Sequence, residues 1–513
     1  MKPQTDNPAF ALDRLAIAGE PDSAALTTRA GTLSYKMLNH RVGQIARWLE
    51  QHGLAKGDRV ASWLPKTELA CVLPLAVARA EMVYVPVNAL LKPGQVGHII
   101  EDSGARLLIT NTPRVKSLEK EPPGGDCSIS SDKEVEQAAD AVSDSLPPNS
   151  EDFDTNKLAA LLYTSGSTGR PKGVMLSHAN LSIGAVSVAE YLKLADSDRT
   201  LCVLPLSFDY GQNQLLSTWM AGGCAVPLDY LTPRDVIKAC IRGDITTLAA
   251  VPPLWVQLVE QEWPPEAVDS MRRLTNSGGA LTSSLVKQLR KIFGSKTDIY
   301  AMYGLTEAFR STFLDPDFID ENPTSMGKAI PHAEIMVISE FGEIAAPDEE
   351  GELVHAGPLV GQGYWQDPER TSERYQPAPE GSRYGGMAVW SGDTVKRGPD
   401  GLLYFVGRTD SMIKSSGNRI SPSEIEKAAL DSGLIAEAAA MGVPDERLGH
   451  AIRLFVRGSG DRNGADDKEA LETWLKRNLP NFMYPQDIVW LNEFPKNPNG
   501  KIDRNALKEG ALT

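Results

Sequence analysis

The most informative stretch of this sequence is residues 163–173, which read YTSGSTGRPKG. Apolar segments typical of buried strands lie on both sides of it, at residues 158–162 and 174–176. Glycines let the backbone bend so that its N–H groups face inward, while the hydroxyls and Lys172 supply donors to phosphate oxygens. The spacing matches neither GxxxxGK[ST] nor GxGxxG. The stretch therefore predicts a polyphosphate-binding turn of another type, because a flexible linker would not need a strand on each side.

The apolar segments around this turn follow an α/β order. From Tyr35 to Leu49 apolar residues recur every three or four positions, which predicts one amphipathic helix ending near Gly53. Further predicted elements are a helix at 67–80 and strands at 60–64, 82–86, 105–110, 158–163, 200–204 and 248–251. Strands that alternate with helices favour parallel βαβ layers, so the predicted fold class is α/β.

Composition excludes several classes of protein. The length of 513 residues predicts about three structural units, and a hydrophobic fraction of 42% is ordinary for a globular protein. No window approaches the ~18 apolar residues of a membrane span, and residues 1–16 lack a secretory signal pattern, which predicts a cytoplasmic protein. The net charge of −15 argues against nucleic-acid binding. Five scattered cysteines and seven unclustered histidines favour neither zinc nor disulfides.

Two regions differ in composition from the rest of the chain. Residues 119–154 hold 11 acidic residues against 2 lysines, and prolines and glycines punctuate residues 112–156. We expect that segment to be a solvated excursion on the surface rather than part of a core. After Asp410 a tail of about a hundred residues has the size of one small domain.

Two later motifs carry groups that suit a nucleotide. Residues 301–307 read AMYGLTE, so one glycine turn could present the Tyr303 ring, the Thr306 hydroxyl and the Glu307 carboxylate to an adenine, an α-phosphate and Mg²⁺. Residues 390–394 read WSGDT, and Asp393 after the glycine suits two ribose hydroxyls. Taken alone, each motif also fits an ordinary turn.

Five motifs occur in a fixed order along the chain: YTSGSTGRPKG, YGLTE, SGD, GRTDSMIKSSGNRISPSEIE and NPNGKIDR. Together they resemble the AMP-forming adenylating enzymes, which include acyl-CoA synthetases, amino-acid adenylation domains and firefly-type luciferases. The resemblance runs from residue 33 to residue 505. Within that superfamily, LPLSFDYGQNQLL, LTNSGGA and YGLTEAFRST resemble the acyl-CoA ligases associated with exosortase gene clusters.

The resemblance implies a fold with two domains that have different functions. It predicts a large N-terminal domain of layered βαβ sheets, residues 1–409, that binds ATP and a carboxylic acid. A small, mobile α+β domain, residues 410–513, would carry the catalytic lysine, with Asp410 as the hinge. Gly417 and Arg419 would lie on the face presented to the thiol after rotation.

The resemblance also assigns roles to residues. It implies catalytic roles for Lys172, Thr306, Glu307 and Lys501, and Glu307 as the ligand of Mg²⁺. The implied ATP-binding residues are Thr164, Ser165, Gly166, Ser167, Thr168, Gly169, Lys172, Gly279, Tyr303, Thr306, Asp393, Arg408 and Lys501. Positive charge from Mg²⁺, Lys172 and Lys501 would neutralise the transition state when a carboxylate attacks the α-phosphorus.

The implied substrate pocket is lined by Asp209, Tyr210, Asn213, Trp255, Ser277, Met302 and Arg310. In amino-acid adenylation domains the aspartate of a Phe-Asp pair binds the substrate ammonium, and Asp209 follows Phe208. Two other roles are open to the Asp209 carboxylate: it could cap a helix, or it could pair with Arg310. Because the lining is too mixed for a long fatty chain, we expect a preference for an acid that bears an amine or another strongly polar group.

The predicted function is an AMP-forming ligase that converts a small carboxylic acid into an acyl-adenylate and transfers it to a phosphopantetheine thiol. That thiol belongs to CoA or to an acyl carrier protein, since both present the same group. One alternative is an amino-acid adenylating enzyme that loads a carrier protein. A catalytically inactive binding subunit is disfavoured, because Lys172, Glu307, Asp393 and Lys501 occur together. Neither nucleic acid nor a membrane is an expected partner.

Overall fold

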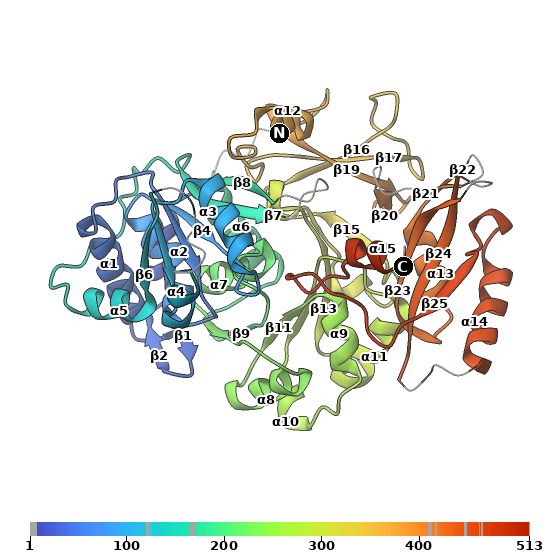
Figure 1. The fold of residues 1–513 in the computed structure, drawn as a ribbon, viewed down its shortest axis with the longest axis horizontal. Helices are drawn as coiled ribbons and strands as arrows, with labels where there is room; N and C mark the ends of the chain where they lie inside the picture. Colours follow the sequence, from blue (N-terminus) through green and yellow to red (C-terminus); the bar gives the residue numbers. More distant parts are fainter. Residues whose placement is uncertain are drawn as a thin grey trace.

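The computed structural model describes residues 8–118, 124, 126–164, 171–408, 413–415, 418–445, 449–460, 462 and 465–511. It consists of a large N-terminal α/β domain and a separate, smaller C-terminal domain (Figure 1). Two extended sheets make up the framework of the N-terminal domain. The predicted fold class is confirmed.

The first sheet has six strands. Their spatial order is β6 (Ser128–Ser131), β5 (Leu107–Thr110), β3 (Arg59–Trp63), β4 (Val83–Pro86), β7 (Leu158–Thr164) and β8 (Lys172–Ser177). Every neighbouring pair is parallel except β7 and β8, which are antiparallel. Successive side chains such as Val60 and Ala61 belong to cores on opposite faces, so both faces of this sheet are covered.

The second sheet has more strands, and its strand pairs are parallel in one part and antiparallel in another. Its spatial order is β2 (Gly31–Ser34), β1 (Ala24–Thr28), β10 (Cys224–Pro227), β9 (Arg199–Cys202), β11 (Thr247–Ala250), β12 (Arg273–Asn276), β13 (Asp298–Tyr303), β14 (Thr312–Phe313), β15 (Ser325–Ala329), β20 (Leu403–Arg408), β19 (Met387–Arg397), β17 (Glu350–Ala356) and β16 (Glu334–Ile338), and β18 (Tyr375–Pro377) pairs with β19. Neighbours from β1 to β13 are parallel, and those from β13 to β16 are antiparallel. In open α/β sheets ligands bind beyond the carboxyl ends of parallel strands, which points to the end of β13.

One large core joins the two sheets through α1, α2, α6 and α7. The helices of this domain are α1 (Tyr35–Gln51), α2 (Glu68–Arg79), α3 (Pro93–Ser103), α4 (Thr112–Leu118), α5 (Asp132–Asp140), α6 (His178–Tyr191), α7 (Asp209–Met220), α8 (Pro233–Gly243), α9 (Pro252–Val259), α10 (Pro265–Val268), α11 (Ser283–Phe293) and α12 (Pro368–Arg374). The predicted helix at 35–49 is α1, which begins where the Ser34 hydroxyl accepts a hydrogen bond from the Met37 amide.

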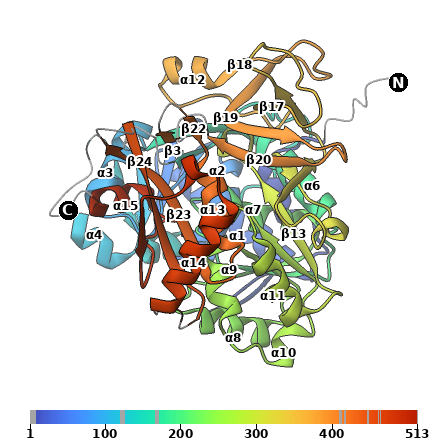
Figure 2. The same ribbon diagram turned by 90° about the vertical axis from the view of Figure 1, so that its right-hand side faces the viewer.

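The C-terminal domain has its own core, formed by residues such as Ile425, Leu454 and Leu471. Its elements are β21 (Ile413–Ser415), β22 (Asn418–Ile420), α13 (Pro422–Leu430), β23 (Ile435–Asp445), β24 (Gly449–Gly458), α14 (Ala465–Asn478), β25 (Asp487–Trp490) and α15 (Arg504–Ala511). In Figure 2 this domain faces the viewer, with α13 and α14 packed side by side over its sheet. A separate core is consistent with a domain that moves as one body.

The predicted strands and helices of the N-terminal domain are found within a few residues of their expected bounds, but the expectation for residues 112–156 was wrong. That segment supplies β6, which extends the first sheet beside β5, and α5, which packs on α1. Val135 and Ala139 on the inner face of α5 are completely buried. Its acidic residues lie on the outer face and in the capping box at Ser131, so charge concealed a short amphipathic helix.

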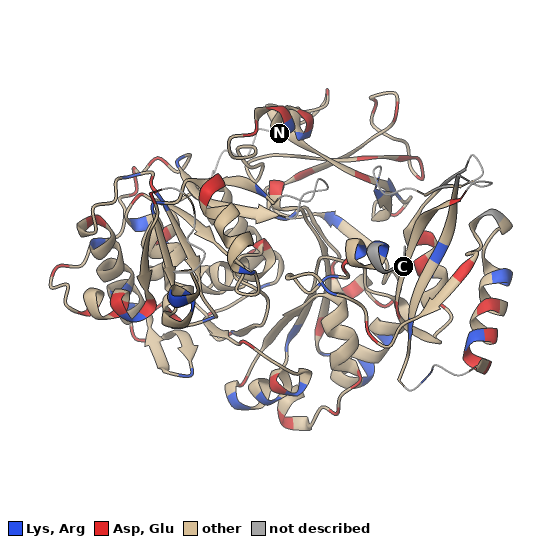
Figure 3. Cartoon of the chain, viewed as in Figure 1, with Lys and Arg blue, Asp and Glu red and all other residues tan. Residues whose placement is uncertain are grey.

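Charges of both signs line the outer helix α14 (Figure 3). Within the ranges given above, the chain has no helix with both the length and the apolar character needed to cross a bilayer.

Candidate active site

The predicted polyphosphate-binding turn lies between β7 and β8. The register of this antiparallel pair sets Thr164 opposite Lys172, so the two residues flank the turn. Ser165, Gly166, Ser167, Thr168 and Gly169 lie outside the described residues. The Thr164 hydroxyl is buried without a hydrogen-bond partner. An unpaired hydroxyl at the mouth of such a turn is suited to a phosphate oxygen.

Lys172, Tyr364 and Glu307 form a connected group of polar side chains. The Lys172 ammonium donates to the Tyr364 hydroxyl at 2.6 Å, and that hydroxyl donates to Oε1 of Glu307 at 2.7 Å. Lys172 Nζ and Glu307 Oε1 are 3.4 Å apart. Burial lowers the pKa of Lys172, and the Glu307 charge opposes that shift. Tyr364 was not singled out in the sequence, although it lies in an aromatic pair after Gly363.

The turn after β13 holds Glu307 and Thr306 in place. Its backbone is strained at Phe309, a non-glycine residue with φ of 60°. The Phe309 ring is completely enclosed against Gly184, where a Cβ atom would lie 2.3 Å from the ring. That packing fixes the turn, and the next residue, Arg310, enters the interior with 2% exposure.

Tyr303, Asp393 and Arg408 meet at the end of β13. The Tyr303 hydroxyl donates to Oδ2 of Asp393 at 2.5 Å, and Arg408 Nη1 lies 3.3 Å from Oδ1 of the same carboxylate. Adjacent strands β19 and β20 place Asp393 opposite Arg408. Burial and the Asp393 charge raise the pKa of the Tyr303 phenol. Three residues assigned to the nucleoside are thus brought together from distant parts of the chain.

Lys501 reaches the N-terminal domain from the C-terminal domain. Its Cε lies 2.7 Å from the point where a Cβ on Gly278 would be, and Gly278 has φ of +81°. Its Nζ lies 5.1 Å from the centre of the Phe208 ring. Burial lowers the pKa of Lys501, whereas the Asp209 charge raises it. The lysine therefore lies between the end of β12 and the start of α7.

The turn that carries Lys501 is anchored by a residue that the sequence did not indicate. The Asn88 amide donates to the Pro498 carbonyl at 3.0 Å and to Oδ1 of Asn499 at 3.2 Å. A single asparagine has no recognisable sequence pattern, so only the fold reveals this contact between the domains.

The predicted substrate residues only partly converge. A small cavity is lined by Tyr210, Asn213, Met302 and Arg310 among others, but not by Asp209, Trp255 or Ser277. Ser277 is linked to the cavity through Arg310, because the Ser277 hydroxyl accepts a hydrogen bond from Arg310 at 2.8 Å. Trp255 is buried in α9, and Gly279 adjoins Pro252.

Asp209 is buried in the first turn of α7, with 5% exposure. Phe208 is the N-cap of that helix, so the capping alternative does not hold. Among the described side chains, Asp209 and Arg310 make no ion pair, and Oδ1 of Asp209 has no hydrogen-bond partner. Burial raises the pKa of Asp209, while the charges of Arg310 and Lys501 lower it. The carboxylate is available to a ligand.

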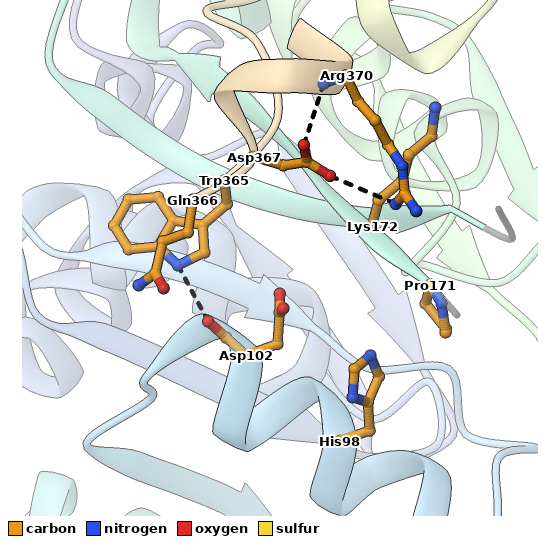
Figure 4. A pocket seen from close by; sticks show the side chains of 8 residues that line it. All are labelled: His98, Asp102, Pro171, Lys172, Trp365, Gln366, Asp367 and Arg370. Atoms are coloured by element: carbon orange, nitrogen blue, oxygen red, sulfur yellow. Dashed lines mark hydrogen bonds and ion pairs between the residues drawn. The ribbon is translucent and has the colours of Figure 1, made fainter. Parts of the chain in front are cut away.

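A larger cavity of about 350 Å³ lies beside Lys172 (Figure 4). It is lined by His98, Asp102, Pro171, Lys172, Trp365, Gln366, Asp367 and Arg370. Trp365 Nε1 donates to the Asp102 carbonyl at 3.1 Å, which ties α3 to the segment before α12.

Some predicted residues cannot be placed. Asp410 and Gly417 lie outside the described residues, and Arg419 belongs to β22 without a described side chain. Within the described part of the chain, no three histidine, cysteine or acidic side chains cluster as a metal site. Glu307 alone still fits Mg²⁺, because this ion is usually held by one or two carboxylates together with phosphate oxygens.

Comparison with known proteins agrees with this geometry. Residues 14–365 match the family model described as AMP-binding enzyme, and residues 424–501 match the AMP-binding enzyme C-terminal domain. Feruloyl-CoA synthase from an Amycolatopsis species is 29% identical over 494 residues, which cover 95% of this chain and 96% of that protein. Tyrocidine synthase 2 from Brevibacillus parabrevis is 29% identical over 506 residues, 95% of this chain but only 13% of that much longer protein.

The fold has close counterparts among solved structures. ATP-bound MatB from Rhodopseudomonas palustris superposes with a TM-score of 0.87 and 26% identity, covering 98% of this chain and 99% of that one. The family matches extend over most of both domains. The chain therefore belongs to the family of AMP-binding enzymes.

Proposed function

We propose that this protein is an AMP-forming ligase that activates a carboxylic acid with ATP and transfers the acyl group to a phosphopantetheine thiol. The observation that carries the proposal is the position of Lys501, which enters the N-terminal domain between Gly278 and Phe208. A lysine that reaches a buried carboxylate and arginine across a domain boundary is suited to an anionic reaction centre.

In the first half-reaction a carboxylate oxygen attacks the α-phosphorus of ATP. A new P–O bond forms, the bond to the β-phosphate oxygen breaks, and pyrophosphate leaves. Lys501 would neutralise charge on the attacking side, and Lys172 would do so near the leaving group. Glu307 would hold Mg²⁺, which supplies further positive charge to the phosphates when bound.

The nucleoside would be held at the end of β13. We assign the adenine to the Tyr303 ring, the ribose hydroxyls to Asp393 and Arg408, and the α-phosphate to Thr306. The hydrogen bond between Tyr303 and Asp393 supports this assignment, because it fixes the ring relative to the ribose-binding carboxylate. Residues 164–169 and Lys172 would surround the β- and γ-phosphates.

In the second half-reaction a thiolate sulfur attacks the acyl carbonyl carbon. The C–S bond forms, the bond from carbon to the phosphate oxygen breaks, AMP leaves, and the thiol proton passes to solvent. We propose that residues 1–409 and 410–513 rotate relative to each other at Asp410, which withdraws Lys501 and brings in Gly417 and Arg419.

The acceptor thiol is CoA in the main proposal. Support for CoA comes from the match of this chain, over nearly its whole length, to a protein named feruloyl-CoA synthase. A carrier-protein acceptor and an amino-acid substrate form the second candidate, favoured by the likeness to tyrocidine synthase 2 and by the buried Asp209. We expect the small acid, ATP and the thiol to meet in the N-terminal domain.

The test is ATP–pyrophosphate exchange with and without added carboxylic acids, followed by analysis of thioester products with CoA. We expect exchange that depends on an acid and that is lost in Lys501→Ala. Normal ATP binding with no exchange for any acid would contradict the proposal and favour an inactive binding homologue.

A further inference from the structure

Little apolar surface joins the C-terminal domain to the N-terminal domain. Of the described apolar side chains beyond residue 409, only Ala436 packs against the large core of the N-terminal domain. A single methyl group buries too little surface to fix the angle between two domains. Hydrogen bonds and ion pairs across the boundary must therefore set this angle.

Helix α9 contacts the C-terminal domain at both of its ends. At the first end lies the N-cap Val251, whose side chain is 3.5 Å from the point where a Cβ on Gly500 would be, next to Lys501. At the other end the C-cap Glu260 pairs with Arg457 of β24. A helix of eight residues is about 12 Å long. Two contacts separated in this way define an orientation, which one contact alone does not.

The Arg457 guanidinium is shared between two carboxylates. Its Nε donates to Oε2 of Glu437 at 2.6 Å, and Nη1 and Nη2 each donate to Oε1 of Glu260 at 3.2 Å. The register of β23 and β24 sets Glu437 opposite Arg457, whereas Glu260 belongs to the other domain. The Arg457 side chain is 15% exposed and that of Glu260 is 32% exposed, so solvent screens their pairing only in part. One side chain thus spans the domain boundary.

The position of Glu260 calls for a cation. The end of α9 carries the negative pole of the helix dipole, and the last turn of this helix has no basic residue. Burial lowers the pKa of Arg457, but its hydrogen bonds to Glu437 and Glu260 and the charges of both raise it overall. Arg457 therefore supplies from the C-terminal domain a charge that α9 lacks.

The domains can separate here without leaving a buried charge alone. Glu437 and Arg457 lie in the same domain and stay paired, and Lys496 Nζ lies 3.8 Å from the other carboxylate oxygen of Glu437. Glu260 would pass into solvent at the helix end. A partly exposed ion pair contributes little free energy, so it shifts an equilibrium between domain arrangements and does not prevent rotation.

We propose, on the basis of the function proposed above, that the ion pair between Arg457 and Glu260 orients the C-terminal domain for adenylation and thereby places Lys501 at the reaction centre. Both are positioning residues, because they act through α9 and the turn of Lys501 rather than on the reacting atoms. The pair forms for the first half-reaction and breaks for the second. Glu260 therefore favours adenylation over thioester formation.

The experiment measures the two half-reactions separately. Adenylation is followed by ATP–pyrophosphate exchange with the best of four probe acids, which are butyrate, benzoate, ferulate and β-alanine, and thioester formation by the reaction of CoA with the acyl-adenylate of that acid. We expect Glu260→Gln to slow exchange about fivefold at low salt, as for the loss of a partly exposed ion pair. Glu260→Arg, which brings two cations together, should slow it further. Thioester formation should be unchanged or faster in both variants.

The control is Glu262→Gln, which removes the same charge from an exposed residue two positions further along. Salt then separates the effect of charge from that of shape. The gap between wild type and Glu260→Gln should close when NaCl is raised from about 20 mM to about 0.5 M, because salt screens the pair. The double variant of Glu260→Gln and Arg457→Gln should be no slower than Arg457→Gln alone. If thermal unfolding shows that Arg457→Gln does not fold, the Glu260 variants carry the test.

Amide hydrogen exchange of residues 497–501 gives a readout that needs no turnover. The turn should exchange faster in Glu260→Arg than in wild type, and Glu262→Arg should leave it unchanged. Unchanged amide exchange in Glu260→Arg, equal slowing of both half-reactions in Glu260→Gln, or a gap that salt does not close would each overturn the proposal. Absence of pyrophosphate exchange in the wild type with every acid would instead contradict the ligase function, and amide exchange would still decide whether the ion pair orients the domain.

Discussion

The Lys172 ammonium lies 2.6 Å from the Tyr364 hydroxyl and 3.8 Å from the centre of the same ring. The same hydroxyl donates to Oε1 of Glu307 at 2.7 Å, and Lys172 Nζ lies 3.4 Å from that oxygen, so one tyrosine bridges an ion pair and fixes its geometry. A hydroxyl that contacts both partners of an ion pair holds both charged groups in fixed positions.

Replacing Tyr364 by phenylalanine should therefore impair the use of MgATP. Without the hydroxyl, Lys172 and Glu307 each lose a hydrogen-bond partner that fixes their positions, and we expect the Mg²⁺ concentration for half-maximal exchange to rise about tenfold, as for the loss of hydrogen bonds to charged groups. Tyr375→Phe is the control, since the Tyr375 hydroxyl donates to the backbone carbonyl of Glu307, at 3.4 Å, and not to its carboxylate. Equal effects of the two variants would deny Tyr364 a positioning role.

Lys501→Ala should nearly abolish adenylation while sparing thioester formation from a supplied acyl-adenylate. Loss of one oriented charge in a buried site removes about 3 kcal/mol of transition-state stabilisation, a reduction of more than a hundredfold. Pyrophosphate exchange and thioester assays measure the two steps separately. The control is Lys496→Ala, because Lys496 lies on the same segment as Lys501 but pairs with Glu437. Wild-type exchange in the first variant would disprove the role.

Asn88→Ala should slow adenylation selectively. The change removes two hydrogen bonds that hold the turn of Lys501, and about 1 kcal/mol for the pair lowers the docked population roughly fivefold. The thioester half-reaction should be unaffected or faster. Asn111→Ala, a local turn residue of another region, provides the comparison. A parallel decline of both half-reactions would mean that Asn88 acts only on stability.

Asp410→Pro should uncouple the half-reactions. Proline fixes φ, and a domain rotation must be absorbed by few backbone angles. We expect one half-reaction to survive and the other to collapse, whereas Asp410→Ala should retain both. Equal loss of both steps in a folded Asp410→Pro protein would refute a hinge at this residue.

Acid should destabilise the protein through His178. Its Nδ1 accepts a hydrogen bond from the Leu12 amide, and burial lowers its pKa from 6.5 to about 4. The unfolded chain therefore binds a proton below pH 6.5 that the folded protein refuses until about pH 4, so stability is lost as pH falls through that window. Between pH 8 and pH 5 this protonation lowers the free energy of unfolding by about 2 kcal/mol.

Denaturant unfolding at the two pH values measures this loss, which His178→Asn should abolish. The exposed His52 gives the control variant His52→Asn, which should leave the pH dependence as it is. An identical pH dependence in the His178 variant and the wild type would show that other groups cause the acid sensitivity.

Local patterns predicted the elements of the fold where one residue type dominates a face. The spacing from Tyr35 to Leu49 defined α1 because Leu38, Val42, Ile45 and Leu49 are completely buried. The same reasoning failed for α5, where only Val135 and Ala139 mark the inner face and acidic residues outnumber them. Short helices whose buried face has two small residues leave too weak a periodicity to detect.

The candidate site was predicted in part for a different reason. Glu307 follows Gly304 in the turn after β13, and Asp393 follows Gly392 within β19, so a glycine near each residue marks it in the sequence. Tyr364 and Asn88 have no such signature, since their roles depend on partners that are distant in sequence. Asp209 was recognised, but its environment depends on Arg310 and Lys501, whose distances only the fold determines.

The close approach of Lys501 to Gly278 has a consequence for the order of the two proposed half-reactions. The lysine side chain takes up space that a methyl group on Gly278 would need, so in this arrangement of the domains the lysine covers the backbone at the end of β12. In the proposed cycle, withdrawal of Lys501 would open that side to a thiol and would remove the charge needed to rejoin pyrophosphate to the adenylate. In that cycle, opening toward the second reaction would prevent reversal of the first, and it would depend on residue 278 having no side chain, because a methyl group there would exclude Lys501.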